Sequence, residues 1–193
     1  MDVVGFAVAG GRSRRMGRDK AGLAWAGTDL LGHALQRLRA VCRDVRLLSG
    51  PERRYADRGV PVIVDSIEDV GSLAALLAGL EAAGGPGLFL GVDLPFVPVP
   101  LLAHLASLAE TADAVVPVSR EGPEPLCAVY GAACLPPIRR CLAEARLKMT
   151  AFWPDVRVCE VGPEKLGAFG DPSRLFRNLN TPADYAAARA EEP

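Results

Sequence analysis

The chain has 193 residues, of which half are hydrophobic and 23% are charged, and its formal net charge at pH 7 is −1. This length and composition suit a soluble globular protein with one domain, which we expect to span residues 1–193. A nucleic-acid-binding protein is usually basic overall, with aromatic residues interleaved among its cations. Neither feature is present, so we expect no nucleic-acid partner.

The charges are distributed unevenly along the chain. Residues 1–60 contain 12 of the 22 basic residues and 6 of the 23 acidic ones, which gives this part a charge of +6. The remaining residues contain 10 basic and 17 acidic residues, which gives −7. A small phosphorylated ligand would therefore be drawn to the N-terminal part of the chain.

Cysteine and histidine usage argues against a zinc site. No two cysteines form a C-x-x-C pair, and there are only two histidines, so we expect the cysteines to be buried thiols in a reducing compartment. Both histidines lie in apolar helical patterns, where a half-buried structural role is expected. The residues concerned are Cys42, Cys127, Cys134, Cys141, Cys159, His33 and His104.

The sequence shows neither an N-terminal signal peptide nor an uninterrupted apolar run of membrane-spanning length. Met1 and Asp2 lead directly into an apolar segment, without a charged region or a cleavage site. We therefore expect a cytoplasmic protein without a membrane partner.

The first distinctive stretch is a short apolar strand followed by a glycine-containing cationic loop. The strand is expected over residues 3–7, and Gly10 and Gly11 then allow the backbone to turn sharply and approach a ligand. Five of the nine residues 12–20 are basic. A strand that ends in a glycine turn and a cationic loop is suited to a polyphosphate, so we interpret residues 8–20 as a nucleotide site. Neither the G-x-G-x-x-G fingerprint nor the P-loop pattern is present.

The remainder of the chain alternates between strand and helix patterns. This alternation predicts an α/β fold: a single three-layer domain with a Rossmann-like, mostly parallel twisted sheet and helices on both faces. The last third is less regular, and its strand over 126–130 could run antiparallel. We expect strands over 45–48, 61–64, 87–92, 114–118, 126–130 and 156–161, helices over 30–41, 72–83, 99–109, 136–146 and from 183, and a loop over 162–171.

Two aspartates directly follow apolar strands, at the sheet edge where the cationic loop is also expected. Asp65 and Asp93 could each simply cap a turn. Asp93 could instead ligate Mg²⁺ that bridges phosphate oxygens, and Asp65 could contact a nucleotide sugar or base. No nucleophile elbow is present, so phosphoryl chemistry fits the residues better than a serine hydrolase mechanism.

Several segments together resemble a known enzyme family. The loop of residues 9–20 (Ala-Gly-Gly-x-Ser-x-Arg-Met-Gly-x-Asp-Lys) resembles the signature of nucleotidyltransferases with a Rossmann-like, GT-A-type fold. Within that group the chain is most similar to the molybdenum cofactor guanylyltransferases. The supporting segments, which cover nearly the full length, are residues 62–65, 71–76, 92–95, 125–126 and the Asn-x-Asn-Thr-Pro motif of residues 178–182.

The resemblance implies a Mg²⁺-dependent transferase of molybdenum cofactor biosynthesis. Its substrates would be GTP and Mo-molybdopterin, and it would transfer GMP to the terminal phosphate of Mo-molybdopterin and release pyrophosphate. Proteins that deliver molybdopterin, and molybdoenzymes that receive the product, are possible partners.

The resemblance also implies roles for individual residues. Lys20 and Arg15 would neutralise the phosphates, and Asp93 would hold Mg²⁺ as the metal ligand. Asn178 and Asn180 would face the pterin. The nucleotide-binding residues would be Val8, Ala9, Gly10, Gly11, Lys20, Asp65 and Asp93.

Two alternatives stay open at this point. Ser72-Leu73 is similar to the corresponding segment of related cytidylyltransferases, so CTP or another nucleotide could replace GTP. A carrier that binds nucleotide or pterin without turnover would belong to a different functional class. The joint presence of Lys20 and Asp93 argues against this second alternative, because a carrier needs no metal carboxylate opposite a phosphate-binding lysine.

Overall fold

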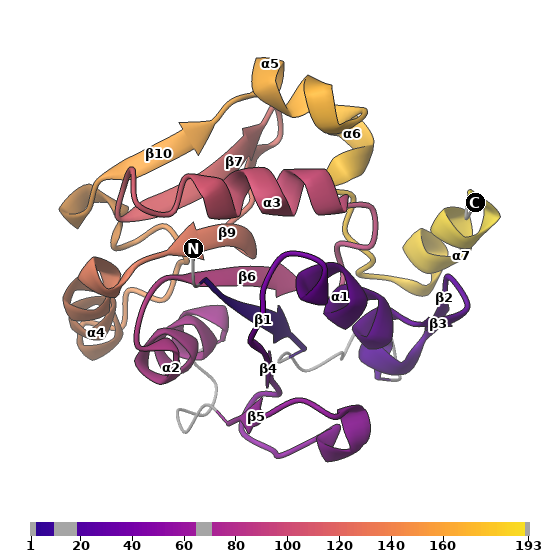
Figure 1. Ribbon diagram of the computed structural model, residues 1–193, viewed down its shortest axis with the longest axis horizontal. Coiled ribbons are helices and arrows are strands. Elements are labelled where there is room, and N and C mark those ends of the chain that lie inside the picture. The colour runs from indigo at the N-terminus through magenta and orange to yellow at the C-terminus, as the bar shows by residue number, and fades with distance from the viewer. Residues whose placement is uncertain (1–2, 10–18, 65–70, 192–193) are drawn as a thin grey trace.

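The computed structural model describes residues 3–9, 19–64 and 71–191 (Figure 1). Its centre is an eight-stranded sheet in the order β10-β7-β9-β6-β1-β4-β5, with β8 paired to β7. Neighbouring strands are parallel except at β9, which runs antiparallel to both β6 and β7, and at β8. The strands are β1 (Val4–Val8), β4 (Val45–Leu48), β5 (Val62–Ile63), β6 (Gly87–Gly91), β7 (Ala114–Ser119), β8 (Gly122–Pro123), β9 (Cys127–Tyr130) and β10 (Val158–Val161).

Helices cover both faces of this sheet (Figure 1). Buried side chains of α1 and α3 pack on one face, and those of α2 and α4 pack on the other. The predicted fold class, a mostly parallel α/β sheet between two helical layers, is therefore confirmed. The helices are α1 (Leu30–Arg39), α2 (Ser72–Ala83), α3 (Val99–Ser107), α4 (Leu135–Ala143), α5 (Pro163–Leu166), α6 (Pro172–Leu175) and α7 (Pro182–Ala190).

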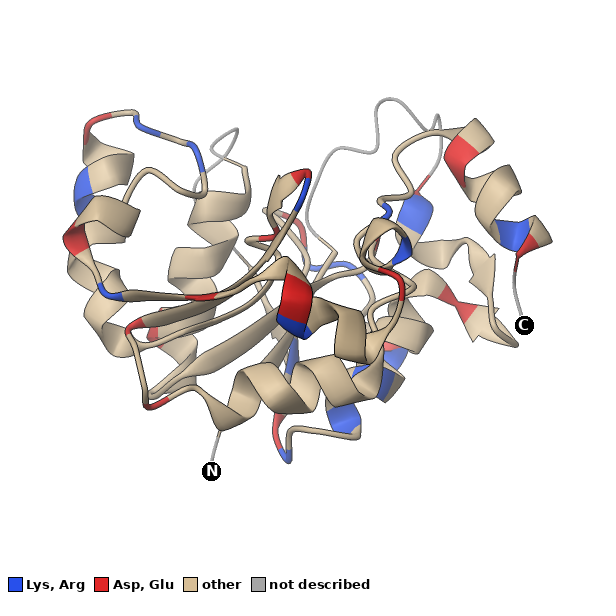
Figure 2. Ribbon diagram, turned by 90° about the horizontal axis from the view of Figure 1, so that it is seen from above, with Lys and Arg blue, Asp and Glu red and all other residues tan. Residues whose placement is uncertain are grey.

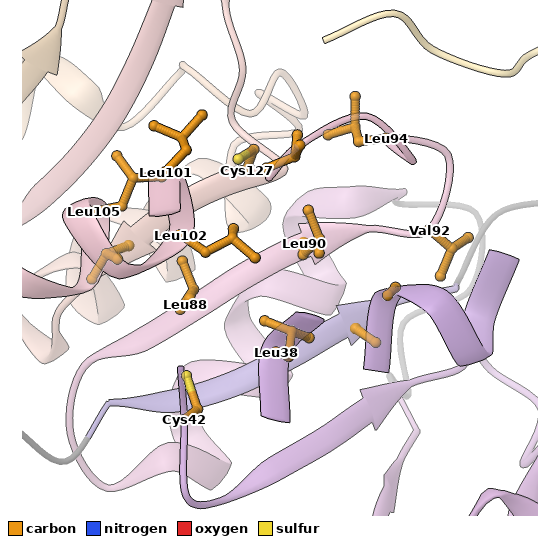
Figure 3. Close-up of a cluster of buried hydrophobic side chains, with 14 of the residues drawn as sticks. Leu38, Cys42, Leu88, Leu90, Val92, Leu94, Leu101, Leu102, Leu105 and Cys127 are labelled. Atoms are coloured by element: carbon orange, nitrogen blue, oxygen red, sulfur yellow. The ribbon is translucent and has the colours of Figure 1, made fainter. Parts of the chain in front are cut away.

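The alternation of side chains along the central strands produces two separate cores. Leu88 and Leu90 of β6 face α1 and α3, where they meet leucines such as Leu38 and Leu102 (Figure 3). Phe89, between them in the sequence, points to the opposite face and stacks on Phe6 with ring centroids 4.8 Å apart. Because every residue of β6 is buried on one face or the other, the strand is apolar throughout, as is typical of doubly covered parallel sheets.

Several predicted helices end earlier than expected. The helix predicted over 30–41 ends at Arg39, that over 99–109 ends at Ser107, and that over 136–146 spans Leu135–Ala143. The prediction of a loop over 162–171 was wrong, because α5 and a 3-10 turn (Gly167–Phe169) lie within it. Burial of Leu166 anchors this short turn, which has too few residues to show a helical period.

A small hairpin and the C-terminal helix pack together beside the main sheet. The hairpin consists of β2 (Ala24–Trp25) and β3 (Thr28–Asp29), and both of its turn residues, Ala26 and Gly27, have positive φ angles. Tyr185 of α7 donates from its hydroxyl to the carbonyl of Ala24 at 2.7 Å. This contact brings α7 next to the β2–β3 hairpin.

Charged residues lie mainly on the helices and connecting segments, while the strands carry few of them (Figure 2). Within the described ranges, no helix combines the length and the apolar character needed to cross a membrane.

Candidate active site

The candidate site lies where the strand order of the sheet reverses. β1 is paired on one side with β4 and on the other with β6, and the carboxyl ends of β1 and β6 meet at the pair Val8 and Gly91. The next helix after β1 is α1, on one face of the sheet, whereas α2, which precedes β6, packs on the other face. In open α/β sheets, such a switch point is where ligands bind.

Asp93 follows β6 and is held at this switch point by backbone hydrogen bonds. The amide of Val92 donates to the carbonyl of Val8 at 3.2 Å, and the amide of Leu94 donates to the carbonyl of Gly91 at 3.2 Å. The carbonyl of Asp93 accepts from the amide of Leu179 at 3.0 Å, which ties the turn to the C-terminal segment. Hydrogen bonds to β1 on one side and to the C-terminal segment on the other thus hold the backbone around Asp93.

Lys20 reaches Asp93 from the start of a 3-10 turn (Lys20–Gly22). Asp19 caps this turn by accepting from the amide of Ala21 at 3.2 Å. The Nζ atom of Lys20 lies 2.7 Å from Oδ2 of Asp93, and the two side chains are 20% and 18% exposed. A cation and a carboxylate separated by 73 positions in the sequence therefore form a partly accessible ion pair.

The Asn-x-Asn-Thr-Pro segment contributes one of its two asparagines to this contact. The Oδ1 atom of Asn180 lies 3.5 Å from Nζ of Lys20. The side chain of Asn178 instead donates to the carbonyl of Phe176 at 3.4 Å. A capping box at the start of α7 fixes Asn180, because Asp184 accepts from the amides of Asn180 and Thr181 at 3.1 and 2.8 Å.

The other predicted nucleotide-binding residues divide into two groups. Val8 and Ala9 are buried at the end of β1, and the amide of Ala9 donates to the carbonyl of Leu48 at 2.9 Å. Val8 and Ala9 therefore lie at the base of the candidate site, at the carboxyl end of β1. The remaining predicted residues lie outside the described ranges, and their roles stay predictions: Gly10, Gly11, Arg15 and Asp65.

Three residues near Lys20 form a contact that the sequence analysis missed. The hydroxyl of Tyr55 donates a short hydrogen bond to the carboxylate of Asp19, and Arg54 Nη1 lies 3.9 Å from the same carboxylate. Tyr55 has a left-handed backbone, with φ 60°, an uncommon conformation for a bulky residue and one found near functional sites. Burial and the bond to Asp19 raise the pKa of Tyr55, so it is a neutral donor at physiological pH. No sequence motif indicates the contact between Asp19 and Tyr55, because the two residues are 36 positions apart.

Glu124 is a second carboxylic acid at the site, and the charge of Asp93 affects its pKa. It precedes β9 and is half-buried. Its burial raises its pKa to about 7, with further contributions from the charges of Asp93 and Glu121. No sequence pattern indicates the role of Glu124, because its place beside Asp93 depends on the antiparallel insertion of β9 next to β6.

The carboxylate of Asp93 is of the kind that can bind Mg²⁺. The described residues contain no group of three or more histidine, cysteine, aspartate or glutamate side chains that could hold a metal ion. Mg²⁺ is commonly bound through one or two carboxylates, with substrate phosphates and water completing its shell. Asp93, whose Oδ2 already has a cationic partner, can supply such a carboxylate.

Comparison with known proteins decides the family. The profile described as "MobA-like NTP transferase domain" matches residues 5–153. The chain belongs to this family. Its likeness to individual proteins extends further, over nearly all of its length.

Two curated relatives illustrate this likeness. The chain is 34% identical to "Probable molybdenum cofactor guanylyltransferase" of Pelotomaculum thermopropionicum, covering 98% of this chain and 93% of the relative. It is 31% identical to "Molybdenum cofactor guanylyltransferase" of Desulfosudis oleivorans, covering 97% and 95%. Among solved structures, it is similar to molybdopterin-guanine dinucleotide biosynthesis protein A of Archaeoglobus fulgidus, with a TM-score of 0.85, 26% identity and 98% of each chain covered.

Proposed function

We propose that the protein transfers GMP from GTP to the terminal phosphate of Mo-molybdopterin, forming the molybdopterin guanine dinucleotide cofactor. The observation that carries this proposal is the meeting of Lys20 with both Asp93 and Asn180 at the switch point of the sheet. This contact brings together the residues that we assign as the phosphate-binding cation and the metal-binding carboxylate, with an amide of the C-terminal motif beside them. The family and the names of the relatives agree with the same reaction.

In the proposed reaction, an oxygen of the terminal phosphate of Mo-molybdopterin attacks the α-phosphorus of GTP. A new P–O bond forms while the bond from the α-phosphorus to the bridging oxygen breaks, and pyrophosphate leaves with that electron pair. Negative charge grows on the leaving group, so cations beside the phosphates lower the barrier. We assign this role to Lys20 and to Arg15.

We assign Asp93 as the protein ligand of Mg²⁺, which when bound would polarise the α-phosphate oxygens. Lys20 occupies Oδ2 of Asp93 at 2.7 Å. We infer that the ammonium group moves from the carboxylate to the triphosphate when the nucleotide and its cation bind. Such an exchange keeps both groups charge-compensated before and after substrate binding.

The substrates are assigned to two sides of this centre. The backbone of residues 8–11 and Asp65 would contact guanosine, and Asn178 and Asn180 would contact the pterin. GTP and Mo-molybdopterin are intracellular metabolites, so we place the reaction in the cytoplasm. Exchange of Mo-molybdopterin and product with delivering proteins and molybdoenzymes is part of the same proposal.

One observation favours a second candidate nucleotide. Ser72 and Leu73 open α2 next to Gly71, whose backbone has φ 74°. This Ser-Leu pair is similar to the segment found in cytidylyltransferases. CTP is therefore the alternative to GTP in the proposed reaction.

The test is a pyrophosphate-release assay with GTP, CTP, ATP and UTP, each supplied with Mo-molybdopterin and Mg²⁺. Matched reactions without Mo-molybdopterin correct for simple hydrolysis. We expect acceptor-dependent release with GTP at least about tenfold faster than with CTP, which corresponds to about 1.4 kcal/mol. A preference for CTP would contradict the guanylyl assignment, and no release from any nucleotide would contradict the enzyme assignment.

A further inference from the structure

The turn that follows Asp93 provides few donors for its own carbonyl groups: the amide of Val97 donates to the carbonyl of Leu94, but only at 3.5 Å. Residues 94–97 are Leu-Pro-Phe-Val, and Leu94, Pro95 and Val97 are buried. Proline has no amide hydrogen to donate, and residues 95 and 98 are both prolines. Buried carbonyls without donors would destabilise the turn, so a donor from outside it is required.

Arg37 of α1 supplies that donor. Its Nη1 atom lies 3.0 Å from the carbonyl oxygen of Leu94, 3.2 Å from that of Pro95 and 2.6 Å from that of Val97. The neighbouring His33 reinforces the contact, because its Nε2 atom lies 3.0 Å from the carbonyl of Pro95. One face of α1 is thereby bonded to the backbone of the turn.

Burying the guanidinium group of Arg37 at this position costs free energy. This cost argues that Arg37 has a role beyond packing. Arg37 is only 7% exposed, and no carboxylate among the described residues forms an ion pair with it. Burial lowers the pKa of Arg37 to about 10, so its charge persists at neutral pH. Removing a charge from water without a carboxylate partner costs several kcal/mol in general, and an apolar side chain would avoid that cost.

We propose that Arg37 is a positioning residue for the transfer reaction: it fixes the turn of residues 94–97 so that the Asp93 carboxylate lies beside Lys20 in the free protein and beside the cation in the substrate complex. The turn is held from one side by Arg37 and from the other by Leu179, whose amide donates to the carbonyl of Asp93 at 3.0 Å. Loss of either support would let the carboxylate move by the ångström or so that matters for catalysis. This inference rests on the proposed function for its effect on catalysis, and on the assignment of Asp93 as a cation ligand for its effect on Mn²⁺ affinity.

The test compares the full-length Arg37→Met and Arg37→Lys variants with an Arg46→Met control. Arg46 of β4 also donates from Nη1 to a backbone carbonyl, that of Ala82, but at the opposite end of the sheet. Three quantities are measured: the dissociation constant of Mn²⁺ for the GTP-bound protein by electron paramagnetic resonance, kcat at saturating GTP, and the KM for GTP.

For Arg37→Met we expect Mn²⁺ affinity and kcat to fall by about 10- to 100-fold, as for other residues that orient a metal ligand, while the KM for GTP changes less. Arg37→Lys should recover part of both losses, because an ammonium group can still donate to one or two of the three carbonyls. Arg46→Met should keep wild-type Mn²⁺ affinity and kcat even where its stability falls.

Three outcomes would overturn the inference. One is wild-type Mn²⁺ affinity and kcat in folded Arg37→Met, and another is an equal loss in Arg46→Met. If Arg37→Met does not fold, Arg37→Lys decides, and unchanged Mn²⁺ affinity and kcat in that variant would count against positioning. If the wild-type protein transfers no nucleotide, the proposed function fails, while the Mn²⁺ measurements still test the positioning role.

Discussion

At the scale of single residues, Gly91 decides where the Asp93 carboxylate can lie. A Cβ atom on Gly91 would stand 2.6 Å from Oδ1 of Asp93, well inside contact distance. The other nearest atoms to that position, in Leu126 and Leu94, are at 3.6 and 3.7 Å, which is ordinary packing. The absence of a side chain at residue 91 therefore serves the carboxylate and not the core.

Gly91→Ala should consequently damage catalysis far more than stability. The carboxylate at the end of a flexible side chain can rotate away, at a cost of about 1 kcal/mol. Its displacement should lower kcat by about 100-fold. Steady-state kinetics and urea unfolding measure the two effects. Gly85→Ala is the control, because a Cβ there meets nothing within 4 Å and activity should be unchanged. Wild-type kcat in Gly91→Ala would show that the position of Asp93 does not matter.

At the scale of elements, the antiparallel strand β9 places a second acid at the site. The first residue of β9, Cys127, pairs with Leu90 near the carboxyl end of β6. Glu124, three residues earlier, therefore lies at the same edge as Asp93, whose charge contributes to its raised pKa. A parallel strand in this position would have placed its preceding residues at the opposite edge.

This placement makes stability depend on pH in a specific direction. The pKa of Glu124 is about 7 in the folded protein and close to the ordinary 4.5 when unfolded, so the folded state holds the proton more tightly. The contribution of Glu124 to the free energy of unfolding should therefore fall as pH rises from about 4.5 to 7, and then level off. Glu124→Gln should lose this component. Urea unfolding of both proteins from pH 5 to 8 measures it, and parallel curves would contradict the assigned pKa.

Elements with long apolar runs and clear end signals were predictable, and those defined by tertiary contacts were not. The apolar run of β6, and that of α2 with glycines directly after it, predicted these elements closely, with α2 at its observed bounds. The β2–β3 hairpin was missed because its strands have two residues each and its turn begins with Ala26, where a left-handed conformation is unexpected.

At the scale of the whole molecule, the sequence predicted the edge of the sheet that carries the site but not the supports of the site. Asp93 and Lys20 could be found because each follows a recognisable pattern. Arg37 could not, because nothing in its helical pattern indicates that it donates to carbonyls 57 to 60 residues away. The partners of Asp19 and the environment of Glu124 similarly depend on how distant elements meet.

The central claim is that the Lys20–Asp93 pair lies at the centre of a guanylyl transfer site. The most direct test is the rate of guanine dinucleotide formation by Asp93→Asn at saturating GTP and Mg²⁺, followed by chromatography. The control is Asp113→Asn, because Asp113 also pairs with a cation, Arg157 at 2.9 Å, but precedes β7 at the opposite edge of the sheet.

We predict that Asp93→Asn unfolds within a few degrees of the wild-type Tm, since the amide keeps the size of the side chain and an oxygen that can accept from Lys20. Its rate of product formation should fall by about 1,000-fold, which is equivalent to roughly 4 kcal/mol of transition-state stabilisation. Asp113→Asn should retain the wild-type rate. A rate for folded Asp93→Asn within about tenfold of the wild type, with the same dependence on Mg²⁺, would contradict the account.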